Sequence, residues 1–256
     1  MRGQGVTAEA ALGLAADNLA DWHATSVAAF GCRSLRWPGV WATDGDVPPI
    51  FLNAIVRPGG PPAAEQVDHL RAIFAGRPAE RGLAIVDYGN DLDLRPLGLQ
   101  PQSPEPCFWR PAGDIHAPPS PPELEILEVR SPALLVDFEQ VSAEGFEAPP
   151  VPPGGWHPPA VLADPRFRVW LGRVDGRPVG AAMAYVGDAV VGVYGVAVAP
   201  SARRHGYGAA LTWRATRVAP DLPAALQPSA MALGVYRRLG YRPIGQFTPW
   251  HRRPAS

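Results

Sequence analysis

The sequence predicts an α/β (α+β) fold: a mixed, mostly antiparallel sheet flanked by helices, organised as two tandem halves. Three observations support this fold class. Apolar runs of strand length alternate with segments of helical spacing along the second half of the chain. A Pro-rich stretch, Ile115–Pro122, lies near the middle of the chain and predicts a semi-rigid extended linker. A short motif occurs in both halves. We therefore expect domains over residues 1–115 and 124–256, joined by a linker over 116–123.

The shared motif is a faint internal repeat. Leu19-Ala20-Asp21-Trp22 aligns with Leu135-Val136-Asp137-Phe138, and at the same offset Ser26 to Phe30 aligns with Ser142 to Phe146. Each segment predicts a helix that ends in an aromatic residue, followed by a loop with a tryptophan, Trp41 or Trp156. A match this short also arises by chance.

The rest of the first half predicts three elements: a strand over Pro49–Arg57, an amphipathic helix over Ala63–Phe74 and a strand over Leu83–Tyr88. The turn between the first strand and the helix is Arg57-Pro58-Gly59-Gly60-Pro61-Pro62. Its three prolines have no backbone N–H to donate. A phosphate cradle made of backbone donors is therefore not expected in this turn.

The second half predicts an antiparallel meander. Its three apolar-rich runs are Phe167–Val174, Arg177–Val186 and Ala189–Ala199. Asp175-Gly176 separates the first two runs and suits a type I′ turn, whereas Gly187-Asp188 suits a type II′ turn.

Four further elements are expected after the meander: a helix over Tyr207–Val218, a short strand over Ala224–Gln227, a helix over Ala230–Leu239 and a strand over Tyr241–Trp250. Pro220 ends the first helix, and Gly240 stands where a left-handed residue follows the second. Pro243 interrupts the last strand, which favours a position near a sheet edge.

The turn between the third run and its helix carries the motif Arg203-x-x-Gly206-x-Gly208. Backbone N–H groups and a helix N-terminus meet here, an arrangement that suits a phosphate. The two glycines allow close approach of the backbone, and Arg203 and Arg204 add charge-assisted donors. The chain has no lysine, which excludes a Walker loop, and Leu211 stands where a dinucleotide fingerprint needs glycine. An ordinary turn between strand and helix explains the string equally well.

The order of elements and two motif blocks resemble the GNAT superfamily of acyl-CoA-dependent N-acyltransferases. The first block is Val198-x-Pro200-x-x-Arg203-x-x-Gly206-x-Gly208-x-x-Leu211. The second is Leu226-Gln227-Pro228-Ser229-x-Met231 with Tyr236-x-x-Leu239-Gly240-Tyr241. The resemblance covers Leu124 to Trp250. Together with the internal repeat and the prolines of the turn Arg57–Pro62, it implies that the first half is a degenerate GNAT-like domain that has lost its cofactor site.

The resemblance implies a cosubstrate site for acetyl-CoA where the fourth and fifth strands splay apart. Val196, Ala197 and Val198 would pair their backbone with the pantetheine arm, and one N–H would polarise the thioester carbonyl and stabilise the oxyanion. An ordinary core strand is compatible with the same residues. The pyrophosphate would lie against the turn, whose implied ligands are Arg203, Arg204, His205, Gly206, Tyr207, Gly208 and Ala209.

The resemblance also implies a catalytic residue. Tyr236 stands where many family members have a phenol that protonates the departing thiolate, although a packing role is the alternative. Ser229 either bonds the cofactor or caps the following helix. We assign no general base: Glu139, Glu144 and Glu147 border the expected acceptor side, but a solvated face explains them equally well. The Pro cluster Pro149–Pro159 is expected to form an ordered loop over that side.

Composition limits the remaining function classes. The chain has 256 residues, 46% hydrophobic and 18% charged, with a net charge of -1. This composition is typical of a globular protein, and the near-neutral charge disfavours a nucleic-acid partner. No apolar run approaches the ~20 residues of a membrane helix, and no signal region follows Met1–Gly5, so a cytoplasmic protein is expected. Cys32 and Cys107 do not make a disulfide framework, and the scattered histidines indicate no metal site.

The function favoured by these observations is N-acetyl transfer from acetyl-CoA to a small amine by direct attack in a ternary complex. A catalytically silent CoA-binding sensor or regulatory module is the alternative. No sequence motif identifies the acceptor or the oligomeric state.

Overall fold

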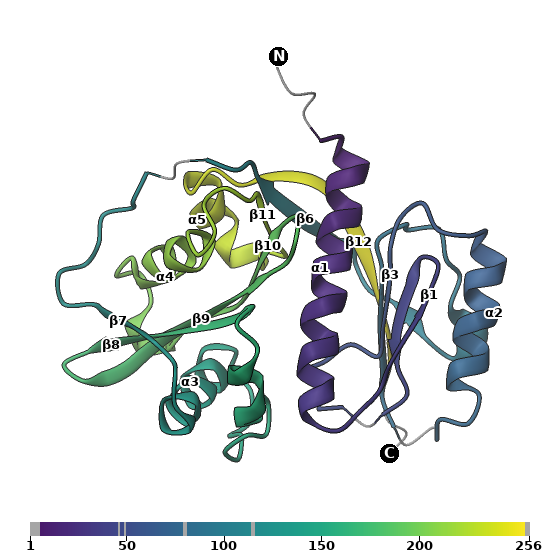
Figure 1. Cartoon of the computed structure of the whole chain (residues 1–256), viewed down its shortest axis with the longest axis horizontal. Coiled ribbons are helices and arrows are strands. Elements are labelled where there is room, and N and C mark those ends of the chain that lie inside the picture. The colour runs from purple at the N-terminus through teal and green to yellow at the C-terminus, as the bar shows by residue number, and fades with distance from the viewer. Residues whose placement is uncertain (1–5, 46, 49, 79–80, 114–115, 254–256) are drawn as a thin grey trace. The chain divides into compact units, whose positions relative to one another are not determined.

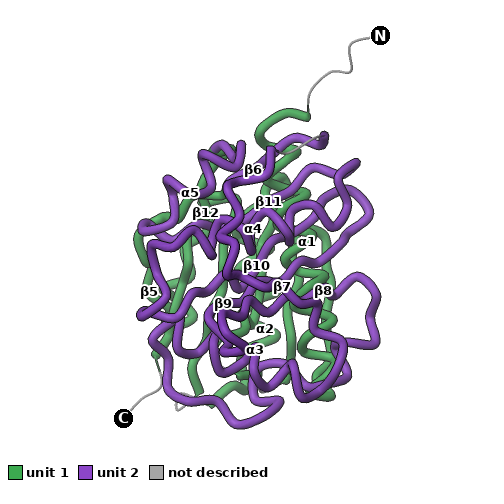
Figure 2. The backbone as a smooth tube through the Cα atoms, turned by 90° about the vertical axis from the view of Figure 1, so that its left-hand side faces the viewer, with its two compact units in different colours: residues 1–107, 243–256 green, residues 108–242 purple. Residues whose placement is uncertain are grey.

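The computed structural model describes residues 6–45, 47–48, 50–78, 81–113 and 116–253. Met1–Gly5, Pro49 at the start of a predicted strand and Ile115 at the start of the predicted linker lie outside these residues. The chain divides into two compact units, which Figure 2 shows in different colours. Unit 1 comprises residues 1–107 and 243–256, and unit 2 comprises residues 108–242.

Unit 1 contains two main helices and a mixed sheet. Its elements in chain order are α1 (Ala8–Ala29), β1 (Ser34–Trp37), β2 (Val40–Thr43), β3 (Ala54–Val56), α2 (Ala63–Phe74), β4 (Leu83–Asp87), the 3-10 turn η1 (Arg95–Leu97), β5 (Gln100–Pro101) and most of β12 (Arg242–Arg252). The strand order is β1-β2-β3-β4-β12, with β5 paired to β12. β3 and β4 run parallel, and the other pairs are antiparallel.

Unit 2 contains three main helices on a second sheet (Figure 1). Its elements are the end of β6 (Glu105–Arg110), β7 (Glu125–Glu128), α3 (Pro132–Gly145), the 3-10 helix η2 (Pro159–Ala163), β8 (Phe167–Val174), β9 (Arg177–Val186), β10 (Val191–Val198), η3 (Pro200–Ala202), α4 (Tyr207–Thr216), β11 (Ala224–Leu226), η4 (Ala230–Ala232) and α5 (Leu233–Arg238). The strand order is β7-β8-β9-β10-β11-β6, and only β10 and β11 run parallel. Figure 1 shows α3 and α4 on opposite sides of β8 and β9.

The two sheets are built in the same order. In each unit three antiparallel strands lead through a helix to a parallel fourth strand, β4 or β11. The antiparallel strand that completes each sheet comes from the other half of the sequence: β12 pairs with β4, and Phe108–Arg110 of β6 pairs with β11. The two units therefore do not coincide with the predicted domains 1–115 and 124–256. Strand pairing over so long a separation leaves no local sequence signal.

The repeat motif lies on corresponding helices, α1 and α3. Thr7 and Ser131 cap their first turns, each accepting a hydrogen bond from the backbone three residues on. The helices end at the aligned residues Phe30 (φ -90, ψ 4) and Phe146 (φ -90, ψ 2). Trp156 lies in a loop as expected, whereas Trp41 lies in β2 and not in a loop.

Two predicted turn conformations are confirmed, and two other local predictions are wrong. Asp175 (φ 49) and Gly176 (φ 75) have the two positive φ values of a type I′ turn, and Gly240 (φ 88) is left-handed, as predicted. The type II′ turn at Gly187 is wrong. Gly187 has no positive φ, and a four-residue connection is closed by its N–H donating to Val190. The predicted edge position of the last strand is also wrong, because β12 pairs with β4 on one side and β5 on the other.

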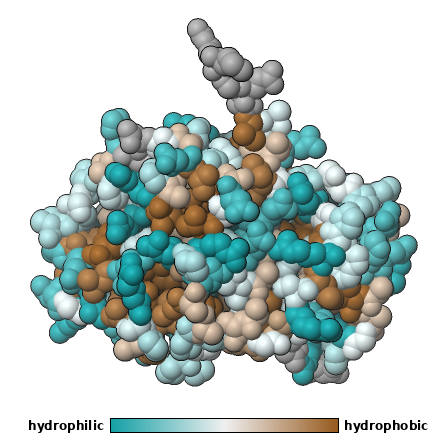
Figure 3. Space-filling model, in the orientation of Figure 1, coloured by the Kyte–Doolittle hydropathy of each residue, from teal (hydrophilic) through white to brown (hydrophobic). Residues whose placement is uncertain are grey.

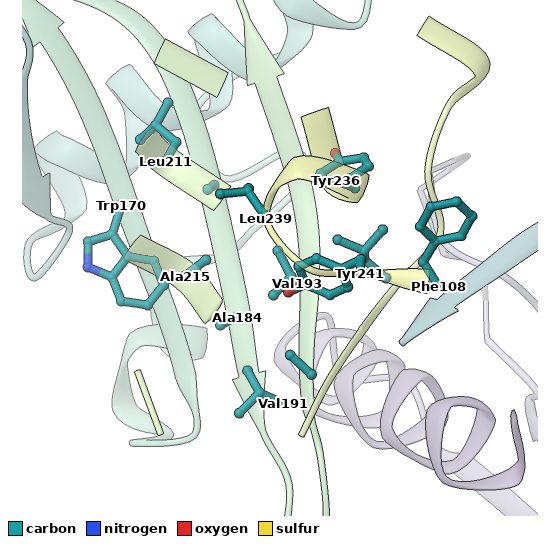
Figure 4. Close-up of a cluster of buried hydrophobic side chains, with 13 residues drawn as sticks. Phe108, Trp170, Ala184, Val191, Val193, Leu211, Ala215, Tyr236, Leu239 and Tyr241 are labelled. Carbon is teal, nitrogen blue, oxygen red and sulfur yellow. The ribbon is translucent and has the colours of Figure 1, made fainter. Parts of the chain in front are cut away.

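The core of unit 2 lies between its sheet and helices α4 and α5. Figure 4 shows Trp170, Ala184 and Val193 from the strands facing Leu211, Leu239 and Tyr241. The core of unit 1 lies between its sheet and α2, around Leu70 and Ile85. Over the face seen in Figure 3, hydrophilic and hydrophobic residues are interspersed within each unit. In the described part of the chain, no helix is both long and apolar enough to cross a membrane.

Candidate functional site

The strands β10 and β11 separate soon after they meet. Only Val191 and Gly192 of β10 pair with β11, at Ala224 and Ala225. Among the residues described, no strand pairs with Val196, Ala197 or Val198 on the β11 side of β10. An unpaired parallel edge presents free backbone donors and acceptors. The structure therefore contains the separated strands that the resemblance implies, and Val196, Ala197 and Val198 lie along the open edge.

A β-bulge lies at the middle of this edge. Between the pairs Tyr194–Met183 and Ala197–Ala181, two residues of β10 oppose one of β9. Gly195 has φ +57, the left-handed conformation that a glycine bulge requires. The bulge re-aims the backbone of Gly195 and Val196. Gly195 was not predicted as a site residue, although an isolated glycine inside an apolar strand run is the usual signal of a bulge.

The turn before α4 presents a run of backbone donors. Arg204 (φ 70) and Gly206 (φ 85) are both left-handed, and Gly206 is the N-cap of α4. Within the described residues, the N–H groups from Arg204 to Gly208 have no hydrogen-bond acceptor. A Cβ on Gly208 would lie 3.5 Å from the side chain of Val198, so the turn packs directly on the end of β10. Five free donors at a helix N-terminus fit an anionic phosphate.

Arg203 does not point into this run of donors. Its Nη2 donates to the carbonyl of Gly145 at 2.9 Å, its Nη1 to Glu147 at 3.0 Å and its Nε to the carbonyl of Val198 at 3.4 Å. Gly145 itself lies against β10, since a Cβ there would be 2.8 Å from that of Ala197. Arg203 thus ties the end of α3 to the end of β10. The exposed Arg204 is the arginine that remains for an anion at the turn.

The other residues of the turn have small local roles. His205 is exposed, its Nδ1 lies 3.3 Å from the carbonyl of Ala202, and its ring stacks on Tyr207 at 5.4 Å. The hydroxyl of Tyr207 donates to Glu123 at 2.8 Å. Ala209 donates its N–H to Gly206 and so belongs to the first turn of α4.

The Pro-rich stretch packs against the start of α4. A cavity of about 480 Å³ is lined by Pro118–Glu123 on one side and by His205, Gly206, Ala209 and Arg238 on the other. The stretch has no regular secondary structure, as the prolines predicted, but it forms one wall of the candidate site. Arg238 was not foreseen as a site residue. Its position in the last turn of α5, close to the second motif block, could have indicated it.

Tyr236 lies in the core of unit 2. It is 7% exposed and packs edge-on against Tyr241, with ring centroids 6.2 Å apart (Figure 4). Val196 of the bulge packs against the same cluster, so the phenol and the open edge of β10 share one environment. Burial raises the pKa of Tyr236 to about 12, and a hydrogen bond with Thr212 partly offsets that effect. The phenol keeps its proton at neutral pH but gives it up less readily than an exposed tyrosine.

Ser229 is exposed at the N-cap position of η4, and its side chain makes no capping hydrogen bond. Only its carbonyl is used, as acceptor for the N–H of Ala232. Of its two expected roles, side-chain capping is therefore wrong, whereas cofactor binding stays a prediction.

The three candidate acids have different surroundings. Glu139 is 1% exposed, and its carboxylate accepts the N–H groups of Gly154, Trp156 and His157 at 2.7 to 2.8 Å. The expectation of a solvated face is wrong for Glu139, which instead fixes the Pro-rich loop 149–159 in place. Glu144 and Glu147 are exposed, and Glu147 pairs with Arg203.

The corresponding turn of unit 1 has no continuous run of donors, because Pro58, Pro61 and Pro62 have no backbone N–H. Pro62 is the N-cap of α2, and the carbonyl of Pro61 accepts a hydrogen bond from Gln66. The Cα of Gly60 lies 2.9 Å from where a Cβ of Gly39 would be, so the hairpin between β1 and β2 fills the space beside the turn. The described residues contain no cluster suited to a metal, and neither Cys32 nor Cys107 is in a disulfide.

Comparison with known proteins identifies the larger part of unit 2. Residues 134–241 match the family model described as the acetyltransferase (GNAT) family. These residues form a GNAT domain. The search of curated proteins found no match.

Solved structures resemble nearly the whole chain. One is a GCN5-related N-acetyltransferase from Kribbella flavida: 24% identity, TM-score 0.66, with 93% of this chain and 96% of that chain covered. Another is a GCN5-related N-acetyltransferase from Sphaerobacter thermophilus: 15% identity, TM-score 0.58, with 88% and 77% covered. At these identities the likeness shows a shared fold. Acyl transfer is the chemistry that the family assignment supports for the GNAT domain.

Proposed function

We propose that this protein is an N-acetyltransferase that moves the acetyl group of acetyl-CoA to an amine of a small acceptor in the cytoplasm. The observation that carries the proposal is the continuity of the open edge of β10 with the donor run Arg204–Gly208. An extended pantetheine arm fits the first, and a pyrophosphate fits the second. Arg204 lies exposed in the turn and Arg238 lines the cavity beside it, so both add positive charge there.

The chemistry follows from the same residues. A backbone N–H at the bulge of Gly195 and Val196 donates to the carbonyl oxygen of the thioester, where negative charge develops during attack. Tyr236 supplies the proton that the departing sulfur takes up, the attacking amine gives up one proton to solvent, and the tyrosinate takes one proton back from solvent before the next turnover. Residues 108–242 contain no cysteine that could carry the acetyl group, which favours direct attack in a ternary complex.

A silent CoA-binding module remains the second candidate, and one observation favours it. Glu139, the most buried of the candidate bases, is fully used by three backbone N–H groups. A sensor needs only the binding surface. An enzyme must also take a proton from the amine, through solvent or through the acceptor itself.

Two measurements on the full chain separate these functions. Calorimetry with acetyl-CoA tests binding, and release of free thiol in the presence of a panel of amines tests turnover. Binding with turnover supports the enzyme, and binding without turnover on any amine supports the sensor. Absence of binding overturns both.

A further inference from the structure

Unit 1 has a cavity whose polar lining is strongly basic. The cavity measures about 490 Å³ and lies at the end of β12 nearest the mark C in Figure 1. Its polar side chains are Asn53, Arg77, Arg81, His251, Arg252 and Arg253. Among the residues described, no carboxylate lines it. The guanidinium groups of Arg77, Arg252 and Arg253 around one space repel one another unless an anion joins them.

The guanidinium groups of Arg77 and Arg252 are held in place by backbone carbonyls, without an acid. Arg77 donates to the carbonyls of Gly82 at 3.1 Å and Gly45 at 3.4 Å. Arg252 donates to those of Leu97 at 3.5 Å and Pro78 at 3.4 Å. The Nε of Arg252 is buried with no hydrogen-bond partner. Burial, with the nearby charge of Arg252, lowers the pKa of Arg77.

Carboxylates close to the cavity have other contacts. Asp44 pairs with Arg33 at 2.6 Å, and Glu105 interacts with His251. Burial raises the pKa of Glu105, which weakens it further as a counter-charge. The positive charge of Arg77, Arg252 and Arg253 is therefore not matched by a described acid.

The remaining walls are apolar. Phe51 and Leu83 are buried at 2% exposure and face the cavity with Val47 and Pro48. The volume lies in the range of small-molecule sites. Guanidinium groups bind carboxylate and phosphate oxygens in pairs, and an apolar wall takes an apolar body. We propose that this cavity is a second ligand site, which binds a small organic anion carrying a carboxylate or phosphate on an apolar or aromatic body.

This site is not a remnant of a CoA cradle. Asn53 precedes β3, and Leu83 and Ala84 begin β4, so the cavity lies at the amino ends of these parallel strands. The turn Arg57–Pro62, which corresponds to the cradle of unit 2, follows the carboxyl end of β3. The proposal therefore stands independently of acetyl transfer in unit 2.

The test measures binding of two probes, phenyl phosphate and benzoate, to the full chain by calorimetry, with and without excess acetyl-CoA. We expect one-to-one binding of at least one probe, unchanged by acetyl-CoA, and none of phenol. The two probes distinguish a phosphate from a carboxylate ligand. Binding of neither at millimolar concentration, or equal binding of phenol, overturns the proposal.

Two matched variants locate the site. Arg253 is exposed and makes no contact that holds the fold, so Arg253→Gln should weaken the probe about tenfold, the effect of one charge-assisted bond. Arg71→Gln removes the same charge from the exposed surface of α2 and should leave affinity unchanged. Equal weakening by both variants, or by neither, contradicts the assignment.

Discussion

Each unit contains a strand, a helix and a second strand parallel to the first. In unit 1 the two parallel strands stay paired, whereas in unit 2 they separate. β3 and β4 pair at all three residues of β3, and Tyr88 adds a further hydrogen bond to Val56. β10 and β11 pair at two residues and then separate. β3 pairs with β2 without a register shift, whereas β10 has the bulge at Gly195. The difference shows that pairing length and one left-handed glycine decide whether such a strand has a paired or an open edge.

The turns that follow β3 and β10 also differ, in the backbone N–H groups that they leave without an acceptor. In unit 2 the turn presents five unused N–H groups, and in unit 1 it contains three prolines and packs on Gly39. Proline at the first positions of a helix costs the helix little, because those N–H groups have no partner inside it. A turn without a continuous run of donors is therefore compatible with the fold of unit 1.

The largest effect is expected from a charge placed at the donor run. Gly208→Asp puts a carboxylate in the first turn of α4, where it suits the helix but repels a phosphate. Affinity for acetyl-CoA should fall at least about 100-fold, while the melting temperature stays level or rises. Ala64→Asp makes the same change at the second position of α2 and should leave affinity unaltered. Equal binding by both variants would remove the distinction between the two turns.

A second comparison separates chemistry from packing in the core. Tyr236→Phe should lower kcat on the order of 100-fold with little change in acetyl-CoA affinity, because only the proton is lost. Tyr241→Phe removes a neighbouring buried hydroxyl, which bonds Thr216 at 2.6 Å. It should cost about 1 kcal/mol of stability and leave kcat within a few-fold. Similar rates for both variants, with chemistry limiting, would leave Tyr236 as a packing residue.

The two neighbouring arginines should respond differently. Arg204→Asn keeps a residue that tolerates the left-handed backbone and should weaken acetyl-CoA about tenfold at constant stability. Arg203→Gln should lower the melting temperature, because it loosens Gly145 and Val198. Thermal melts and calorimetry on both variants check this. A stable Arg203→Gln with the larger loss of affinity would return the phosphate role to Arg203.

The smallest effect at neutral pH concerns a buried histidine in each unit, whose contribution to stability changes only in acid. Burial lowers the pKa of His23 and of His157 to about 3. The unfolded chain takes up their protons below about pH 6.5, and the folded chain does so only near pH 3, so stability is lost as the pH falls between these values. Each histidine contributes about 1.4 kcal/mol per pH unit. Denaturant melts of His23→Phe and His157→Phe should each show a shallower acid slope than the parent chain.

Features set by neighbouring residues could be predicted from the sequence. The meander, the type I′ turn at Asp175-Gly176, helix α2 and the glycine turn before α4 all depend on short patterns of apolar spacing, glycine and proline. The donor run needed no knowledge of distant contacts. It follows from a strand, two glycines and a helix in sequence order.

Features set by distant partners could not be predicted in this way. Glu139 looks like a surface acid until the loop 149–159 folds back to donate three N–H groups to it. Arg203 looks like a phosphate ligand until Gly145 and Glu147 reach it from α3. The basic cavity of unit 1 joins three segments, around Asn53, Arg77 and His251, that no spacing pattern connects.

The exchange of β6 and β12 sets an order of events during synthesis. The ribosome releases residues 1–107 long before Thr248–Arg252, which pair with β4, leave the exit tunnel. Until then β4 is an open edge, able to recruit the wrong strand from the same or another nascent chain. The first unit made is thus the last to be finished, and a truncation of only the final strand would leave it incomplete.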